Sequence, residues 1–419
     1  MLKNIRNVIA VLLLFGILAG YGGSGIVCAA EGKQAPDVQI FEKGVLYQKG
    51  KIKVVELNGT YRQMGRQYGK LLAAEIRGMY AEVVKQFALN KIASADGQLE
   101  EFSRKLFKLY PKRFRDIAEG MSETSGMGID KIAVLNESFD FLISPGPPAA
   151  APAGEHNHCS SIAVWGDYTG GGPLVMGRNF DFPAFYKNFN PYIVVVVFNP
   201  TDGSHSAAAI AYAGQIGVVQ ALNDAGLVLE NNDGSNCGDQ QRYFGERTPF
   251  LIKDLEMAFD YSTAEGLDAA LKGARFHFPL IFNVAFPDKA YSYEMTTFDV
   301  KRRDGERGLL IGVNHFVHPE WVSPQPGKDG FAGNSVTRYK NLAALAAKYK
   351  GSIDASRMMA ILDIPLSKGG ATPPDKSIYQ FVTVPASLKL WVKAPGYTQW
   401  TEIDLKKLFH RGVKTGVTR

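Results

Sequence analysis

The hydrophobic pattern of this chain changes its period once, and that change is the strongest constraint on its fold. Between residues 60 and 143, apolar side chains such as Met64 and Ile76 recur at helical spacing. Between residues 161 and 231 the chain carries short apolar or alternating runs separated by turn residues, a pattern typical of strands. Helices followed by many strands predict an α+β fold in which helices cover packed sheets.

The same pattern predicts the individual elements. Asn58-Gly59 is a turn signal and Thr60 is suited to cap the first helix. Helices are expected at 60–84, 102–110, 113–122, 129–141, 248–259, 263–272, 338–350 and 354–362. Strands are expected at 51–56, 161–165, 174–178, 192–198, 207–212, 217–222, 227–231, 282–285, 290–295, 309–313, 378–384 and 389–392. We expect the strands between 161 and 231 to form one antiparallel meander.

The first 30 residues have the composition of a secretory signal peptide. Lys3 and Arg6 precede the apolar run 8–18, and the small residues of 27–30 supply a cleavage site. The run is shorter than the roughly 20 residues of a membrane span. We expect the signal to be removed and the mature protein to be secreted or periplasmic, at the cell envelope, without stable membrane insertion. A retained anchor or a lipid-modified Cys28 is the alternative.

Composition and charge narrow the class of partner. The chain is 46% hydrophobic and 21% charged, which is ordinary for a globular protein. Its formal net charge of +6 is mild, and two of these charges lie in the signal. The basic run Lys301-Arg302-Arg303 is followed at once by Asp304 and resembles a strand end or hairpin. We therefore expect a small-molecule partner and no nucleic acid.

The candidate chemistry centres on Cys159. This residue follows a stretch, 145–158, that begins as a Pro/Ala/Gly-rich linker, and it opens an apolar strand. Arg178 and Asp181 return on the next expected strand. A thiol nucleophile needs a thiolate, a proton acceptor and donors for the oxyanion. Arg178 is expected to hold the thiolate by charge, and Asp181 to orient the proton acceptor.

The proton acceptor need not be a histidine. His156 and His158 precede the cysteine within the linker. If Cys159 were an N-terminal residue, its own α-amine, with an ordinary pKa near ~8, would take the thiol proton. Cutting between His158 and Cys159 would free that amine. The chain would then consist of a helical N-terminal segment, 31–158, and a catalytic region, 159–419.

These residues resemble the N-terminal-nucleophile (Ntn) linear amide hydrolases. That group includes the choloylglycine hydrolases, the acid ceramidase and N-acylethanolamine amidase group, and the penicillin acyltransferase group. The family pattern is Cys-Thr-Ser-Ile followed by Gly-Arg-Asn-hydrophobic-Asp. It is matched by Cys159-Ser160-Ser161-Ile162 and Gly177-Arg178-Asn179-Phe180-Asp181. Residues 56–69 and Ala118-Glu119-Gly120 resemble the acyltransferase branch.

The resemblance implies a four-layer αββα Ntn-hydrolase sandwich with a mostly helical N-terminal pro-segment, made as a precursor. Cys159 would attack the carbonyl of His158, release itself as an N-terminus, and then form a thioester with an amide substrate. Water would complete hydrolysis, and an amine would complete acyl transfer. The resemblance implies neither a cofactor nor a metal. Ser160 replaces the family Thr, His158 is unusual before the cut, and the linker is long, which affects the expected efficiency and position of self-cleavage.

Further site residues follow by the same matching. The hairpin at 222–227 leads toward an oxyanion residue, for which Asn232 is our assignment while the registers of Asn231 and Asp233 stay open. In Val313-Asn314-His315-Phe316, the amide of Asn314 is expected to donate to the oxyanion. At the helix start Ser335-Val336-Thr337-Arg338-Tyr339, the arginine is expected to support the site.

Other interpretations compete with this one. A lone cysteine at a strand start is often only a small buried hydrophobe. Cys159 and Cys237 could instead form a disulfide. His156-Asn157-His158-Cys159 could bind a metal, although the sequence offers no further ligands at the spacing of a zinc site. A papain-like protease would need a different cysteine context. An inactive exported binding or envelope protein of the same fold is the rival from another class. The sequence does not distinguish bile-salt, penicillin, N-acyl-homoserine lactone and lipid amide substrates.

Overall fold

Two sheets lie face to face at the centre of the computed structural model, which describes residues 38–93, 97–144, 159–235, 237, 242–321 and 331–410. The predicted signal peptide at 1–30, the linker 145–158 and the cleavage residue His158 lie outside the described residues.

The larger sheet has ten strands and the smaller has six. In spatial order the larger sheet contains β1 (Gln39–Phe41), β2 (Gly44–Lys49), β3 (Ile52–Gly59), β6 (Ile193–Pro200), β7 (Ala207–Tyr212), β8 (Gln220–Asn223), β9 (Val228–Asp233), β10 (Leu280–Ala285), β11 (Ala290–Met295) and β12 (Val300–Asp304). The smaller contains β13 (Leu309–Gly312), β4 (Ser160–Val164), β5 (Val175–Asp181), β14 (Ser377–Val384), β15 (Lys389–Lys393) and β16 (Thr401–Asp404).

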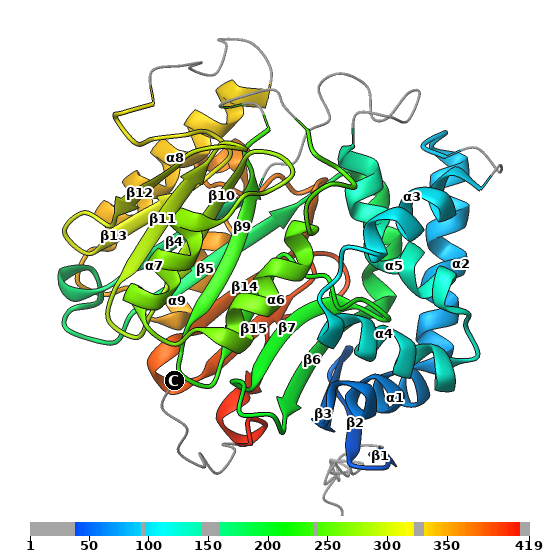
Figure 1. Ribbon diagram of the computed structural model, residues 1–419. Helices are drawn as coiled ribbons and strands as arrows, with labels where there is room; N and C mark the ends of the chain where they lie inside the picture. Colours follow the sequence, from blue (N-terminus) through cyan, green and yellow to red (C-terminus); the bar gives the residue numbers. More distant parts are fainter. Residues whose placement is uncertain are drawn as a thin grey trace, which may run out of the picture. The chain divides into compact units, whose positions relative to one another are not determined.

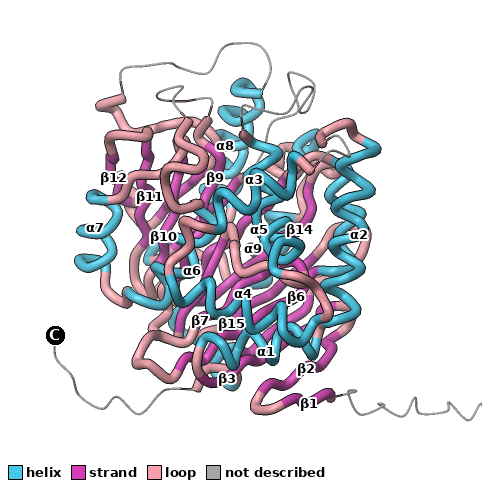
Figure 2. The backbone as a smooth tube through the Cα atoms, turned by 45° about the vertical axis from the view of Figure 1, so that its right-hand side comes forward, coloured by secondary structure: helices cyan, strands magenta, loops and turns pink. Residues whose placement is uncertain are grey.

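Helices cover the outer faces of both sheets. The described helices are α1 (Tyr61–Leu71), α2 (Ala73–Leu89), α3 (Gln98–Phe107), α4 (Lys112–Ser125), α5 (Ile129–Ile143), α6 (Phe250–Asp260), α7 (Ala264–Gly273), α8 (Phe331–Lys348) and α9 (Ala355–Leu362), of which α2 to α5 pack mainly on other helices. Helix α6 packs on β7, β8 and β9, and α9 packs on β5 and β14 (Figure 1). Figure 2 shows the strands as a central block with helices on either side.

The inner faces of the two sheets meet directly. A Cβ built on Gly312 of β13 would overlap the amide of Asn283 on β10, so the Asn283 side chain packs directly against the β13 backbone. Arg178 of β5 reaches Glu230 of β9 across the same interface. The predicted α+β fold with an αββα sandwich is therefore confirmed.

The strands expected to form one meander belong to two sheets instead. β4 and β5 pair with each other in the smaller sheet, whereas β6 to β9 run antiparallel in the larger one. Periodicity indicates which residues are strands, but it does not determine which strand is the hydrogen-bonded neighbour. β1, β2, β12 and β16 were not predicted as strands in their own right, because they are short or polar and mostly lie at sheet edges.

The helical segment before the linker also differs from the prediction in two ways. The long helix expected at 60–84 is interrupted at Leu72, where the backbone leaves helical geometry, so α1 and α2 are separate. Thr60 caps α1, as predicted, and Gln63 completes a reciprocal capping box. In addition, β1 and β2 precede the expected strand β3, and β3 pairs in parallel with β6. The segment before the linker is therefore part of the larger sheet, and Pro36–Arg419 groups as one unit.

Within the described residues, no helix combines the length and apolar composition that a membrane span needs.

Candidate active site

Cys159 lies immediately before β4, at the end of the smaller sheet. The neighbouring strand β5 pairs with β4 in the register Ser160 to Asn179 and Ser161 to Arg178, which brings the two parts of the motif side by side. The cysteine is only 3% exposed, and its Sγ lies 3.7 Å from the backbone oxygen of Asp181. Antiparallel pairing therefore converts a separation in sequence into direct contact.

Arg178 is fully buried and points across to the larger sheet. Its guanidinium donates to the backbone oxygens of Val219, at 2.9 Å, and of Asn231, and also to the side chain of Gln220 at 3.0 Å. Its Nε lies 2.8 Å from a carboxylate oxygen of Glu230. The arginine is thus held by several groups of the opposite sheet, which fixes its charge near the thiol.

Glu230 is a residue of the site that the sequence interpretation missed. It is fully buried on β9, and it accepts from the amide of Asn283 as well as facing Arg178. Burial raises its pKa, and the Arg178 charge opposes that shift. The sequence did contain a signal for Glu230, which is the one charged residue in the expected strand 227–231. A carboxylate on a buried strand is rarely found without a cationic partner, so it indicates an ion pair.

Asp181 ends β5 and is fully buried. One of its carboxylate oxygens accepts from the hydroxyl of Ser377 at 2.5 Å, and the other has no hydrogen-bond partner among the described residues. Burial raises the pKa of Asp181 to about 7, although Ser377 and the nearby Arg338 and Arg178 oppose the shift. This residue therefore combines a carboxyl whose pKa is raised to about 7 with a backbone oxygen in contact with the thiol.

Asn314 and Arg338 meet at the backbone of the cysteine. The guanidinium of Arg338 donates to the carbonyl oxygen of Cys159 and, at 2.9 Å, to the side-chain oxygen of Asn314. The Asn314 amide nitrogen donates to the backbone oxygen of Asp233 at 2.9 Å. Ser335, one turn before Arg338, accepts from the Asn314 backbone N–H at 3.0 Å. The structure therefore brings Arg338 to Cys159 directly, and Asn314 next to it through Arg338.

The structure places Asn232 away from the thiol. Its side chain, oriented to satisfy its donors and acceptors, contacts Glu230 and Asn283 between the sheets. Asn231 and Asp233, the two alternative candidates for the oxyanion residue, line the pocket that contains Cys159. Because side chains alternate along a strand, the register decides which side chain reaches the pocket.

The thiol itself is protonated in this environment. Burial raises the pKa of Cys159 to about 11, against the lowering effect of Arg178. Among the described residues, no histidine is hydrogen-bonded to this thiol. The thiol therefore needs a different proton acceptor before it can act as a nucleophile.

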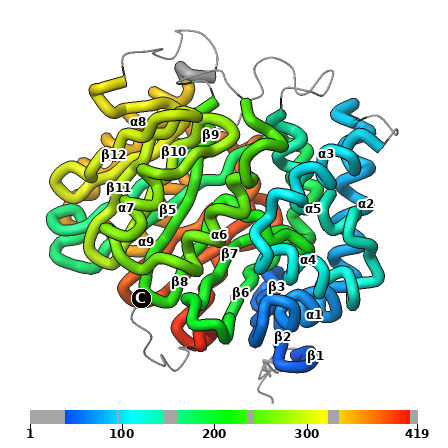
Figure 3. The backbone as a smooth tube through the Cα atoms, viewed as in Figure 1, coloured from blue at the N-terminus to red at the C-terminus, as the bar shows by residue number. Residues whose placement is uncertain are grey.

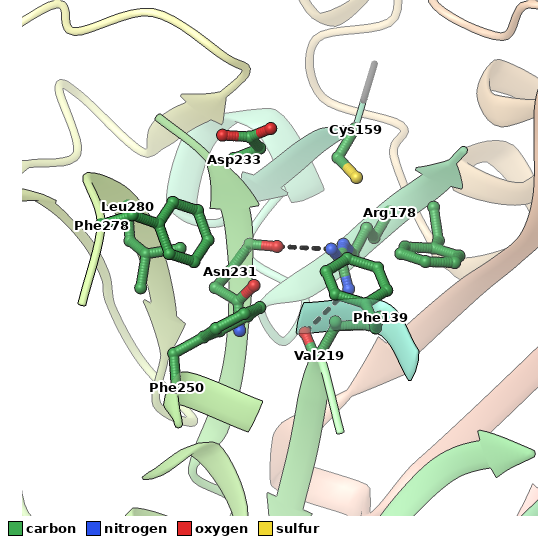
Figure 4. Close-up of a pocket in the computed structure, with 10 residues that line it drawn as sticks. Phe139, Cys159, Arg178, Val219, Asn231, Asp233, Phe250, Phe278 and Leu280 are labelled. Carbon is green, nitrogen blue, oxygen red and sulfur yellow. Dashed lines mark hydrogen bonds between the residues drawn. The ribbon is translucent and has the colours of Figure 1, made fainter. Parts of the chain in front are cut away.

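A narrow, mostly apolar pocket opens beside the thiol (Figure 4). Its cavity volume is about 10 Å³. In Figure 4 the Cys159 thiol points in the direction of Arg178, while Phe278 and Leu280 form the opposite wall. Phe139 comes from α5, before the linker, and Phe250 comes from α6. The remaining lining residues are Phe180, Val219, Asn231 and Asp233.

Both described cysteines are free thiols, so the disulfide alternative is wrong for this structure. The Sγ of Cys237 lies 3.7 Å from the backbone oxygen of Asn314, behind the site. The other half of the suggested metal cluster, His156 and His158, lies outside the described residues.

Comparison with known proteins returns structural similarity alone, since no protein-family model and no curated protein sequence matches the chain. A mutant of the conjugated bile acid hydrolase from Clostridium perfringens is 14% identical with a TM-score of 0.41, covering 59% of this chain and 93% of its own. The N-acylethanolamine-hydrolyzing acid amidase ortholog from Caenorhabditis elegans is 16% identical with a TM-score of 0.39, covering 54% and 93%. The penicillin V acylase from Agrobacterium tumefaciens is 13% identical with a TM-score of 0.40, covering 62% and 89%.

Proposed function

We propose that this protein is an exported cysteine amidase that cuts itself between His158 and Cys159 and then hydrolyses a non-peptide linear amide. The observation that carries the proposal is the meeting of Arg178, Asp181, Asn314 and Arg338 around one buried thiol at the start of a strand. These residues come from separate parts of the chain, and each has a role in amide chemistry.

In the proposed self-cleavage, the Asp181 carboxylate takes the proton of the Cys159 thiol. The sulfur attacks the carbonyl carbon of His158, and the peptide bond between His158 and Cys159 breaks as a thioester forms. The released nitrogen takes up the proton and becomes the α-amine of Cys159. Water then hydrolyses the thioester, which leaves a carboxylate on His158 and a free thiol. This route supplies the proton acceptor that the buried thiol lacks.

In the proposed turnover, the α-amine takes the thiol proton and the sulfur attacks the substrate carbonyl. The Asn314 amide nitrogen carries two hydrogens, and one of them is occupied by the Asp233 carbonyl. The other is available for the oxyanion, where such donors act most strongly. The leaving amine takes the proton, and water hydrolyses the thioester. The unpartnered oxygen of Asp181 suits an ammonium group at the new N-terminus.

Intact-mass analysis of the purified protein beside a Cys159→Ala variant tests the proposal. We expect the wild type to separate into fragments that end at His158 and begin at Cys159, and the variant to stay whole. A wild type that stays whole after ageing at neutral pH would contradict self-cleavage. It would favour the inactive exported binding protein, or processing by another protease.

The same purified protein can distinguish hydrolysis from acyl transfer in a competition experiment. An added amine nucleophile competes with water for the thioester of any substrate that acylates Cys159. We expect the free acid to remain the main product. A predominance of the new amide would assign the chain to acyl transfer.

A further inference from the structure

We propose that Glu294 is a positioning residue for the reaction at Cys159. Its buried carboxylate holds the segment 313–318 so that Asn314 presents its amide to the oxyanion. The inference rests on the proposed function, because it gives Asn314 the role of oxyanion donor.

Glu294 lies on β11 of the larger sheet, and its side chain is fully buried. One carboxylate oxygen accepts from the backbone N–H of Val317 at 2.8 Å, and the other accepts from that of His318 at 2.9 Å. The Nε of Arg303 lies 3.4 Å from the first oxygen. Two successive backbone N–H groups and a guanidinium thus converge on a single carboxylate, an arrangement that gives short and directional bonds.

Segment 313–318 leads away from the smaller sheet. It continues from β13, whose last residue, Gly312, pairs with Ser161 of the nucleophile strand. β11 and β13 lie at the same end of the two sheets and contact each other (Figure 1). The other end of the Arg303 guanidinium donates to the backbone oxygen of Ile311 at 2.7 Å. Glu294 and Arg303 therefore grip the segment on both sides of Asn314 from across the sandwich.

These contacts control the distance between the Asn314 amide and the oxyanion, on which catalysis depends. An oxyanion donor must lie about 2.7–3.1 Å from the developing charge, and site residues need placement to within about 0.5 Å. Arg338 and Asp233, the last residue of β9, orient the Asn314 side chain, and Ser335 accepts from its backbone N–H. They do not connect its backbone to β11. Glu294 supplies that connection and so fixes the backbone that follows Asn314 against β11 of the larger sheet.

A purely structural role would require less. A buried ion pair between Glu294 and Arg303 would stabilise the sheet without reference to the loop, and buried pairs contribute little net stability. Both carboxylate oxygens are instead bonded to the N–H groups of the loop. Because both carboxylate oxygens accept from N–H groups of the segment 313–318, we infer that Glu294 positions this segment.

The test compares two reactions of the same thiol in wild type and Glu294→Gln. Acylation of Cys159 by p-nitrophenyl acetate passes through an oxyanion, whereas alkylation by iodoacetamide does not. Glutamine keeps the shape, but its amide group faces a backbone N–H with another donor. We expect acylation to slow by about 10-fold to 100-fold, less than or comparable to the loss of a whole oxyanion donor. Alkylation should stay within about twofold, since thiol access and charge are unchanged.

Glu320→Gln is the matched control, because Glu320 is 66% exposed near the same segment and forms an ion pair with Lys301. It should leave both reactions unchanged. If Glu294→Gln slowed acylation and alkylation equally, the residue would be structural and the inference would be overturned.

A double-mutant cycle with Asn314→Ala asks whether Glu294 acts through Asn314. In the Asn314→Ala background, Glu294→Gln should cause no further loss of acylation, because coupled residues are not additive. Full additivity would overturn the inference. A wild type that is alkylated but never acylated at Cys159 would instead overturn the proposed function, and the inference with it. Normal acylation in both wild type and Glu294→Gln would overturn the inference alone.

Discussion

At the scale of single residues, the site combines groups that burial drives away from their charged forms. The thiol of Cys159 has its pKa raised to about 11, and the carboxyl of Asp181 has its pKa raised to about 7. The difference between these two pKa values matters, because proton transfer from a thiol to a carboxylate is more favourable when the carboxyl pKa is raised. Arg178 opposes both shifts and limits the cost of charge formation.

Asp181 therefore predicts the pH dependence of self-cleavage. Below pH of about 7 its carboxyl is protonated and does not accept the thiol proton, so the rate should fall as pH falls through that value. Above it the carboxylate predominates and the rate should level off. Asp181→Asn should slow cleavage by about 100-fold and abolish the inflection. Cleavage rates measured by intact mass between pH 5 and pH 9, both values being about two units from the pKa, check this.

Asp363→Asn serves as the control for that series, since Asp363 is 38% exposed and pairs with Lys393. It should leave the profile unchanged. An inflection near neutrality that persisted in Asp181→Asn would assign the titration to another group.

At the scale of elements, glycines determine how the helices before the linker cross. Gly65 and Gly69 of α1 face α4, where Gly120 faces α1. A Cβ at Gly65 or Gly120 would overlap a backbone oxygen of the other helix. The two helices therefore pack backbone to backbone. This gives a physical reason for the glycines in two segments that resemble the acyltransferase branch.

Gly120→Ala should accordingly destabilise the protein. The added methyl group meets the carbonyl of Arg62, which has no flexible end to move aside. Overpacking of this kind costs about 1–3 kcal/mol. Gly128→Ala is the control, because no atom lies within 4 Å of the added Cβ, and it should change stability by less than about 0.5 kcal/mol. Equal unfolding midpoints for the two variants in denaturant would contradict the close crossing.

At the scale of the whole molecule, the two chains expected from self-cleavage share one sheet. Figure 3 shows β3, in blue, beside the green β6, which comes after the linker in the sequence. Seven residue pairs, from Lys53 and Val194 to Gly59 and Pro200, join β3 and β6 in parallel register. Phe139 of α5 also lines the pocket of Cys159. The smaller chain therefore contributes both to the core and to the site.

We expect the cut protein to remain one particle. Denaturing gels should show two fragments, while size-exclusion chromatography under native conditions should give one peak that contains both. Separation would require exposing the core face of β3 and the apolar sides of α1 and α5, which is unfavourable in water. The Cys159→Ala variant, as the uncut reference, should elute at the same volume. A fragment that eluted alone would contradict this interpretation of the shared sheet.

The sequence alone determined the α+β class, most helices and strands, and the assignment of Cys159, Arg178 and Asp181 to one site. Those features are local: side-chain period reports secondary structure, and adjacent strands place a short motif together. Only the tertiary structure decided how β4 and β5 separate from β6 to β9, and that β1 to β3 join the larger sheet. It also decided the register that turns Asn231 toward the pocket instead of Asn232, and revealed Glu230 and Glu294. These depend on pairings between distant segments, which periodicity does not encode.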